Sequence, residues 1–260
     1  MTPSVLWAEH TAPELRTAAA DGAVAILPVA AMEQHGPHLP TMVDFRLCSE
    51  VAKRGAELAA ARGTQALVLP PVWSGMSDHH IPFGGTASLS FDAFRAVILG
   101  IARSIHASGF SRLFVLNGHG GNVSALPIIL QEAAAIEGLR AAGATYWFLA
   151  ETEIRAVLED QPGVRHACEA ETSMMMVLEP DLIRRENLSK AFGGEEPKAS
   201  AGVPDPVFVW RDFAERTTTG VIGDARRASP QKGTKLLSAC AAALAEALCD
   251  PRTWTKQAPR

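Results

Sequence analysis

The sequence predicts an α/β fold, a single domain in which helices cover both faces of a mainly parallel central sheet. Short apolar runs of strand length alternate with longer helix-like segments along most of the chain. The segments between the apolar runs are long enough to be helical crossovers, which parallel strands require. With 260 residues and no internal repeat, the chain can bury a substantial core as one domain, residues 1–260.

Local patterns place the expected elements along the chain. The apolar runs predict strands at residues 23–30, 65–70, 112–116 and 144–150. Helical spacing and capping residues predict helices at residues 13–20, 44–61, 90–108, 123–137 and 230–248, with Ser90 or Asp92 and Ser229-Pro230 at two of the starts. Residues 193–206 are expected to form an exposed loop, and residues 207–210 a last strand.

Composition excludes several classes of protein. The net charge of −4 and the lack of a long basic run argue against nucleic-acid binding. The apolar segments are too short or too interrupted to span a bilayer, and the first residues do not resemble a secretory signal. The four cysteines form no CxxC pair and no disulfide framework, so we expect a cytoplasmic protein.

One stretch, residues 23–44, organises the expected site. It reads AVAILPVAAMEQHGPHLPTMVD and begins as an apolar run suited to a buried strand. Glu33 and His35 follow two residues apart, so in extended backbone their side chains point to the same face. Asp44 then opens the next predicted helix. Any one of these residues alone is usually a solvated loop residue, but together they can form half of a metal site.

Other polar residues follow the remaining predicted strands. In open α/β sheets, ligand sites lie beyond the carboxyl ends of the strands. The residues in such positions are His79 and His80 after the second strand, His119 after the third, and His166, Glu169 and Glu171 after the fourth. We therefore expect these side chains to converge with the first group at one edge of the sheet.

The glycine-rich turn NGHGGN, residues 117–122, has the setting of a phosphate-binding turn without its spacing. Val123 stands where the third glycine of GxGxxG would be, and no Walker lysine follows. We interpret the turn as one that brings the backbone close while His119 points at the site. A G-x-S-x-G elbow is also missing from the sequence, which argues against serine-hydrolase chemistry.

The segment HACEAETS, residues 166–173, leaves three hypotheses open. His166 and Glu171 can supply a proton-transfer group and a metal ligand, although Glu171 can also be a simple helix cap. Cys168 beside His166 permits a cysteine-nucleophile amidase, which would survive chelators and be inactivated by iodoacetamide. The third hypothesis is a protein that binds a metal or ligand without catalysis.

Five motifs together resemble the creatininase (creatinine amidohydrolase) family. They are PVAAMEQHGPHLPTMVD, GMSDHHIPFGGTASLS, LNGHGGN, HACEAETS and TGVIGD, and they run in the family's order from about residue 26 to residue 224. The resemblance implies a three-layer α/β/α fold and hydrolysis of C–N bonds other than peptide bonds. It also implies two divalent metal ions per chain (Zn, Mn or Fe), a small-molecule substrate and a homohexamer.

The same resemblance implies which side chains would bind metal. Glu33 and His119 would hold one ion and His35 the other. Asp44 would bridge both, as a carboxylate can when two ions lie about 3.5–4 Å apart. Two such ions would share a water molecule, lower its pKa from about 15.7 toward 7 to give a bridging hydroxide, and polarise the amide carbonyl.

The remaining ligand is where this sequence departs from creatininase. Creatininase carries a glutamate two residues after the histidine of its glycine-rich turn, whereas this chain has Gly121. We expect Glu171 to take that role, with Glu169 as the weaker candidate. The departure argues against creatinine as the substrate. Cys168 also differs, because it replaces the family's usual glycine.

Further positions correspond to proton transfer and substrate binding in the family. His166 would protonate the leaving nitrogen, a contribution typically worth about 10²–10⁴-fold. His80, Gly120 and Gly121 are the expected substrate-binding residues. His79 stands where a more usual member has an acidic residue.

The substrate is expected to be a small amide, formamide or cyclic amide. Family relatives open the creatinine ring, deformylate a pyrimidine intermediate or trim a peptide in mycofactocin maturation. Residues 151–165, ETEIRAVLEDQPGVR, are largely polar and offer no counterpart to the tryptophans that close over substrate in creatininase. A peptidase of the mycofactocin-maturation type is the alternative.

Overall fold

A central sheet of four parallel strands forms the middle of the protein. The computed structural model describes residues 4–159, 161–194 and 210–255. In spatial order the strands are β2 (Ala66–Val68), β1 (Val24–Val29), β3 (Arg112–Asn117) and β4 (Arg140–Thr145). The predicted parallel sheet is therefore confirmed, with β1 and β3 at its centre.

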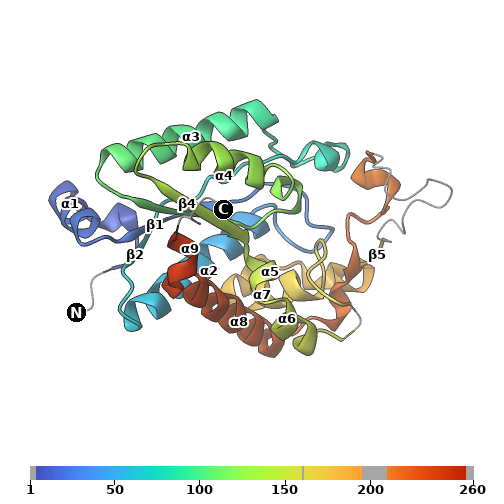
Figure 1. Ribbon diagram of the computed structural model, residues 1–260. Coiled ribbons are helices and arrows are strands. Elements are labelled where there is room, and N and C mark those ends of the chain that lie inside the picture. Colours follow the sequence, from blue (N-terminus) through green and yellow to red (C-terminus); the bar gives the residue numbers. More distant parts are fainter. Residues whose placement is uncertain (1–3, 160, 195–209, 256–260) are drawn as a thin grey trace.

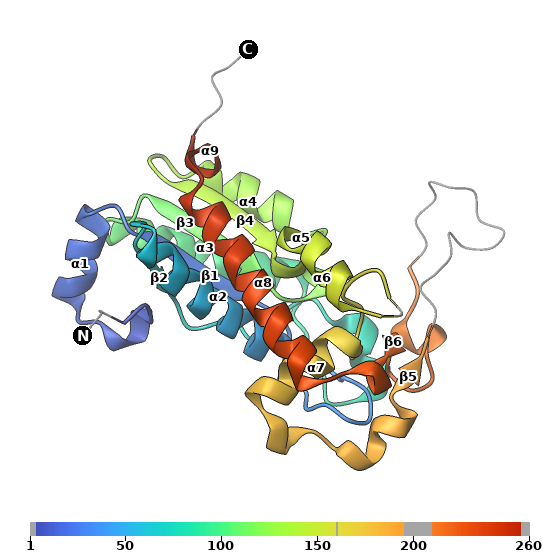
Figure 2. The same ribbon diagram turned by 90° about the horizontal axis from the view of Figure 1, so that it is seen from below.

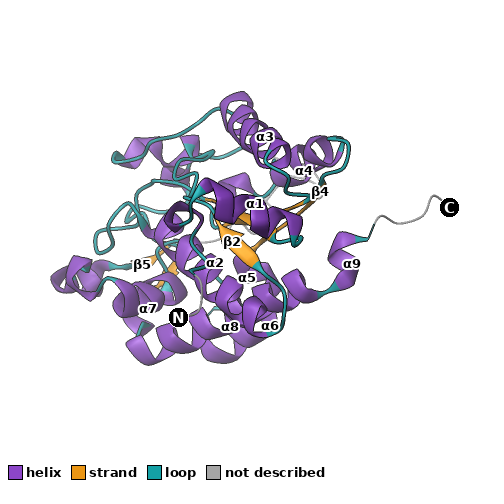
Figure 3. Cartoon of the chain, turned by 90° about the vertical axis from the view of Figure 1, so that its left-hand side faces the viewer, coloured by secondary structure: helices purple, strands orange, loops and turns teal. Residues whose placement is uncertain are grey.

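Helices cover both faces of this sheet and make three layers (Figures 1 and 3). Above the sheet in Figure 1 lie α3 (Phe91–Ala107) and α4 (Leu126–Ala134). Below it lie α2 (Val43–Ala61) and α8 (Pro230–Cys249), and Figure 2 shows α8 running alongside α2 with α7 (Glu169–Leu178) at its end. The three-layer α/β/α expectation is confirmed.

The residues of β1 alternate between the two layers of helices. Val24 and Ile26 belong to the apolar core on the side of α2 and α8, whereas Ala25 and Leu27 belong to the core on the side of α3 and α4. Successive side chains of a strand point to opposite faces, and here both faces are buried. This double burial explains why the strand reads as a continuous apolar run without polar alternation.

Shorter elements complete the chain. The remaining α-helices are α1 (Ala12–Ala20), α5 (Tyr146–Leu149), α6 (Glu151–Val157) and α9 (Pro251–Trp254). The 3₁₀ turns are η1 (Trp7–Glu9), η2 (Asp78–Phe83), η3 (Gly120–Asn122), η4 (Pro180–Leu182), η5 (Arg185–Lys190), η6 (Phe213–Glu215) and η7 (Ala225–Arg227). Strands β5 (Phe192–Gly193) and β6 (Gly223–Asp224) pair antiparallel in a separate small sheet.

Two of the expected helix starts are capped as the sequence predicts. The Ser90 hydroxyl accepts a hydrogen bond from the Ala93 amide (3.3 Å), so Ser90 rather than Asp92 caps α3. Ser229 caps α8 in the same way, with Pro230 in the first turn. Such caps satisfy an amide that the helix itself leaves without an acceptor.

The fourth strand was predicted at the wrong place. We expected residues 144–150, but β4 spans Arg140–Thr145 and the aromatic residues that follow form α5. Most of β4 consists of alanine and glycine, which carry little strand signal. Gly143 is required there because a Cβ would lie 2.6 Å from the Val115 carbonyl oxygen of the neighbouring strand.

Other expected boundaries are corrected or lie outside the described residues. The helix predicted at residues 123–137 is shorter, since α4 spans Leu126–Ala134 after the 3₁₀ turn η3. The loop expected at 193–206 begins with β5, but residues 195–209, and with them nearly all of the strand expected at 207–210, are not described. Among the described helices, none combines the length and apolar composition needed to cross a membrane.

The contact between α7 and α8 depends on a glycine. A Cβ at Gly233 would lie 2.0 Å from the Ser173 carbonyl oxygen, so we expect Gly233→Ala to lower the free energy of unfolding by about 1–3 kcal/mol. Gly100 in α3 is the matched control, because no described atom lies within 4 Å of the position that a Cβ would take there, and Gly100→Ala should raise stability by about 0.5–1 kcal/mol. Urea unfolding of both variants measures this, and equal effects would contradict the packing described.

Candidate metal centre

The side chains that follow the strand ends meet in one buried cluster. Glu33 lies beyond β1, Asp44 lies in the first turn of α2, and His119 lies beyond β3. His35 and Glu171 reach the same place from the loop after β1 and from the first turn of α7. All five are at most 4% exposed, so they are not solvated loop residues.

Asp44 lies between two histidines. Its Oδ1 is 3.0 Å from Nε2 of His35, and its Oδ2 is 2.9 Å from Nδ1 of His119. Each histidine also faces a second carboxylate, because Glu33 Oε2 lies 3.3 Å from His119 Nδ1 and Glu171 Oε1 lies 4.0 Å from His35 Nε2. The cluster therefore has two halves that share Asp44.

The other ring nitrogen of each histidine is held by a backbone carbonyl. Nδ1 of His35 lies 3.1 Å from the Glu33 carbonyl oxygen, and Nε2 of His119 lies 3.1 Å from that of Met76. A carbonyl oxygen only accepts, so these nitrogens carry the hydrogen when the rings are neutral. The nitrogens that face the carboxylates then have free lone pairs, as in metal-ligating histidines.

The arrangement fits a divalent cation. Neither His35 Nε2 nor Asp44 Oδ2 has a hydrogen-bond partner of acceptable geometry among the described residues, although oppositely charged atoms lie near both. The described residues contain four overlapping groups of three possible ligands, and within each group the three ligand atoms lie within 4.8 Å of one another. The groups are Glu33/His35/Asp44, Glu33/His79/His119, Glu33/His80/His166 and His35/His166/Glu171. Histidine nitrogens and carboxylate oxygens that are buried without a hydrogen-bond partner are suitable ligands for zinc and other first-row transition metals.

The two candidate glutamates of α7 have different surroundings. Glu169 is occupied, because the Lys232 ammonium group and the Glu159 backbone amide both bind its carboxylate. Glu171 accepts a hydrogen bond from the Ala167 amide (2.6 Å) with one oxygen and faces His35 with the other. The geometry therefore favours Glu171 over Glu169 as a ligand.

The pKa values reflect this crowding of charges. Burial opposes protonation of His35, but Asp44 and Glu171 outweigh it and raise its pKa to about 9. Burial likewise opposes protonation of His119, and Glu33 and Asp44 raise its pKa well above the usual value. Burial raises the pKa of Glu171 to about 8, although His35 acts against this shift. In the metal-free protein, protons on these groups compensate the buried negative charge.

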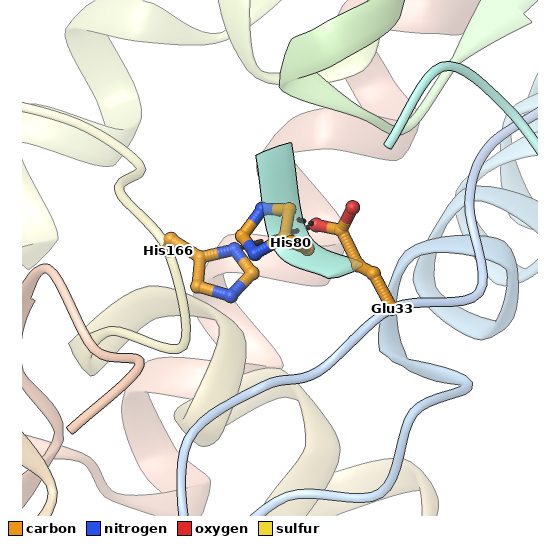
Figure 4. A group of neighbouring side chains, drawn as sticks. All are labelled: Glu33, His80 and His166. Atoms are coloured by element: carbon orange, nitrogen blue, oxygen red, sulfur yellow. Dashed lines mark ion pairs between the residues drawn. The ribbon is translucent and has the colours of Figure 1, made fainter. Parts of the chain in front are cut away.

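Two further histidines lie on the other side of Glu33. In Figure 4, His80 and His166 come from separate segments of the chain, and both point toward the Glu33 carboxylate. Glu33 Oε1 lies 3.3 Å from His80 Nε2 and 3.5 Å from His166 Nδ1. Burial lowers the pKa of both histidines, so both rings are neutral near pH 7.

A cavity of about 440 Å³ opens onto the cluster, and Gly120 and Gly121 contribute to its lining. The aromatic residues Trp147, Trp210 and Phe213 also line it. These tryptophans lie on either side of the stretch 151–165, which itself offers none. The sequence did not predict that these aromatic residues line the cavity, because neither their spacing nor a periodic pattern indicates it.

Gly121 marks the departure from creatininase in structural terms. A Cβ there would lie 2.2 Å from the Met76 carbonyl oxygen and 2.4 Å from Nε2 of His119. His79 also lies over this position, with its ring stacked on His119 at a centroid distance of 5.8 Å. This backbone has no room for a glutamate at residue 121.

Comparisons with known proteins agree with this fold. The family model for creatininase, described as creatinine amidohydrolase, matches residues 8–248. The chain belongs to the creatininase family. Two relatives in this family, a peptide peptidase and a creatinine amidohydrolase, are hydrolases.

Two relatives and one solved structure define the similarity. A mycofactocin precursor peptide peptidase of Mycobacterium ulcerans (strain Agy99) is 32% identical over 217 residues, covering 82% of this chain and 79% of that protein. The creatinine amidohydrolase of Pseudomonas putida is 30% identical over 260 residues, covering 93% of each chain. A structure titled "Creatininase Mn" superposes with a TM-score of 0.77 at 29% identity, covering 94% of this chain and 97% of that one.

Metal uptake should release protons. At pH 7.5 the metal-free site holds a proton on His35, whose pKa is about 9, and a cation must displace it. We expect on the order of one proton or more per chain to be released at pH 7.5, and fewer as the pH rises past 9. Calorimetric titration of metal into apo-protein, in two buffers of different ionisation enthalpy, measures the number. Uptake without proton release at pH 7.5, or equal release from His35→Gln, would contradict the assignment.

Proposed function

We propose that this protein is a dinuclear metal-dependent amidohydrolase that cleaves a non-peptide C–N bond of a small amide, formamide or cyclic amide. The observation that carries the proposal is Asp44, whose two oxygens face different histidines. Each of those histidines faces a carboxylate of its own. A carboxylate placed in this way is suited to bridge two cations.

The proposed ligands divide into two sets that share Asp44, a division that follows the carboxylates facing each histidine. Glu33, Asp44 and His119 would hold one ion, and His35, Asp44 and Glu171 the other. Zn, Mn and Fe all accept such mixed nitrogen and oxygen ligands, and the similar structure titled "Creatininase Mn" supports manganese as one candidate. Divalent ions bound there would supply water that ionises near neutral pH and would polarise the substrate carbonyl.

His166 is the proposed proton carrier. Its Nε2 lies 2.8 Å from the Gln34 carbonyl oxygen, which leaves the Nδ1 lone pair directed toward Glu33 and the site. Burial lowers the pKa of this ring and keeps it neutral, so Nδ1 has a free lone pair for a proton of the attacking water and gives that proton up readily. The same proton then passes to the leaving nitrogen as the C–N bond breaks and the new C–O bond is completed.

The cavity is suited to a small, flat substrate. Trp147 and Phe213 provide aromatic faces, and the backbone of Gly120 and Gly121 lies open to the cavity without side chains. His80 is only 1% exposed and directs both ring nitrogens at protein groups. We therefore assign His80 a positioning role beside Glu33 in place of the substrate contact expected from the sequence.

A cysteine nucleophile is not supported by the surroundings of Cys168. Its side chain is fully buried, and burial raises the pKa of the thiol to about 11. Cysteine nucleophiles act as thiolates and therefore need a lowered pKa. Cys168 instead accepts a hydrogen bond from the Arg165 amide in the loop before α7.

A peptidase is the second candidate function. The mycobacterial relative named above is a peptide peptidase. In this chain, Arg211 and Arg216 are among the residues that line the cavity. Guanidinium groups are well suited to bind a carboxylate, such as the one at the end of a peptide.

Assembly and compartment are proposed on family likeness alone. We propose a homohexamer in the cytoplasm. Sedimentation velocity of the purified protein tests the assembly, and a monomer at micromolar concentration would refute it.

The choice between the two glutamates of α7 can be tested with a matched pair of variants. Glu171→Gln removes a proposed ligand, so we expect it to retain about one ion per chain instead of two. Glu169→Gln removes one of the two carboxylates that pair with Lys232, so it should keep both ions and lose stability. Elemental analysis of the folded variants measures the ions, and the reverse result would assign the ligand to Glu169.

The proposed activity is tested with a panel of formamides, cyclic amides, creatinine and short peptides. We expect the metal-loaded protein to hydrolyse a member of the amide group, chelation to abolish the activity and iodoacetamide to leave it intact. His166→Gln should keep the metal and lose about 10²–10⁴-fold in kcat. Cleavage of peptides alone would favour the second candidate, and activity that survives complete metal removal would refute both.

A further inference from the structure

Gln34 lies between Glu33 and His35 in the sequence, and its side chain has no part in the proposed reaction. Its side chain is buried and is surrounded by His80, His166 and Gly220. Gly220 belongs to the motif TGVIGD, none of whose residues is a proposed ligand or proton carrier. The contacts of this one residue, through its carboxamide and its main-chain carbonyl, decide where two histidines carry their protons.

The orientation of the Gln34 carboxamide follows from a backbone amide. The Gly36 N–H, which can only donate, lies 2.8 Å from Gln34 Oε1. The amide nitrogen Nε2 must therefore face the other neighbours. These are His80 Nδ1 at 2.9 Å, His166 Nε2 at 3.0 Å and the Gly220 carbonyl oxygen at 3.1 Å.

Three neighbours compete for two hydrogens, and the backbone resolves the competition. His166 Nε2 lies 2.8 Å from the main-chain carbonyl oxygen of Gln34, which can only accept. His166 Nε2 therefore carries a hydrogen and cannot accept one from the carboxamide. The two carboxamide hydrogens are left for His80 Nδ1 and the Gly220 carbonyl oxygen.

This assignment fixes the remaining protons. A neutral imidazole has one donor and one acceptor nitrogen. His80 accepts at Nδ1, so its hydrogen is on Nε2, directed at Glu33 Oε1 at 3.3 Å. His166 donates at Nε2, so its lone pair is on Nδ1, 3.5 Å from the same oxygen.

We propose that Gln34 is a positioning residue that sets the tautomers of both histidines, His80 through its carboxamide and His166 through its main-chain carbonyl. The catalytic meaning of the His166 tautomer rests on the proposed function. For His80, the tautomer has a further consequence. Its Nε2 lies among possible ligand atoms, with Glu33 and His166, but a nitrogen that carries a hydrogen cannot bind a metal.

The position of the Gln34 carboxamide explains why residue 220, the first glycine of TGVIGD, has no side chain. A Cβ at this residue would lie 2.2 Å from Gln34 Oε1, and its φ of +76° is one that side chains disfavour. Two residues later, the Ile222 amide donates to the His166 carbonyl oxygen (2.9 Å). The motif therefore holds the Gln34 carboxamide and the His166 backbone together.

The test reads the ring nitrogens directly. Histidine-selective ¹⁵N labelling and two-bond proton–nitrogen correlation spectra show which ring nitrogens carry hydrogens, with His80→Gln and His166→Gln used for assignment. In both apo- and zinc-loaded protein we expect hydrogen on Nε2 and a lone pair on Nδ1 for both rings. A protonated Nδ1 or a zinc-bound Nε2 in His80 would overturn the proposal.

The variant Gln34→Glu then tests whether the carboxamide of Gln34 sets the tautomer of His80. It replaces the donor beside His80 Nδ1 by an acceptor, so His80 should become protonated at Nδ1 while His166, held by the main-chain carbonyl, is unchanged. We expect kcat on an amide that the wild type hydrolyses to fall about 10–100-fold with metal content retained. Gln131→Glu, on the exposed face of α4, is the charge-matched control and should change nothing. An unchanged His80 ring in Gln34→Glu would overturn the proposal, as would equal changes in both rings.

A second pair of variants tests the role of Gly220. Gly220→Ala should displace the carboxamide and weaken the hydrogen bond at His80 Nδ1, which the same spectra detect. Gly63→Ala is the matched control, because Gly63 also has a positive φ (+85°) and no described atom lies within 4 Å of the position that a Cβ would take there. Wild-type ring signals in Gly220→Ala would refute this role. Since no spectrum needs a substrate, these results are independent of whether the proposed activity is found.

Discussion

The burial of three carboxylates in one place is the constraint on which the rest of the site depends. Glu33, Asp44 and Glu171 are each at most 4% exposed. An uncompensated buried charge costs several kcal/mol, so positive charge must be supplied. In the metal-free protein, His35 and His119 supply it as protonated rings. Metal cations would replace these protons. The buried carboxylates therefore need positive charge both for the stability of the fold and for the binding of metal.

The sheet explains why these residues meet. The chain passes from β1 to β2 on one side and then to β3 on the other side of β1, so the order of the strands reverses between β1 and β3. In open α/β sheets, ligands bind in the crevice at such a switch point. Glu33 follows β1 and His119 follows β3, which brings both to this crevice, and Asp44 reaches it at the start of α2. Both central strands are buried along nearly all of their length, so the site lies on the packed core of the protein.

Around the ligand atoms, each histidine is fixed by a group that can only accept or only donate. Backbone carbonyls hold His35 and His119 with their free nitrogens toward the carboxylates. The carboxamide and carbonyl of Gln34 do the same for His80 and His166, with different results. Ring orientation alone would leave several histidines equally able to bind metal. Hydrogen bonds to groups of fixed polarity distinguish a ligand from a proton carrier.

The elements with strong local signals could be predicted from the sequence. Strands β1 and β3 are buried on both faces and therefore appear in the sequence as apolar runs. Ser90 and Ser229 indicate the starts of the helices that they cap. The sequence also placed the polar residues at the strand ends, since that inference needs only the order of elements. Local signals failed for β4, where alanine and glycine fit against a neighbouring strand.

Which atoms face one another could be known only from the packing of the whole chain. It separated Glu171 from Glu169, which stand two residues apart but face His35 and Lys232 respectively. It also brought Gln34 to Gly220, 186 residues along the chain. Periodicity and capping act over a few residues, whereas contacts of this kind depend on how the whole chain packs.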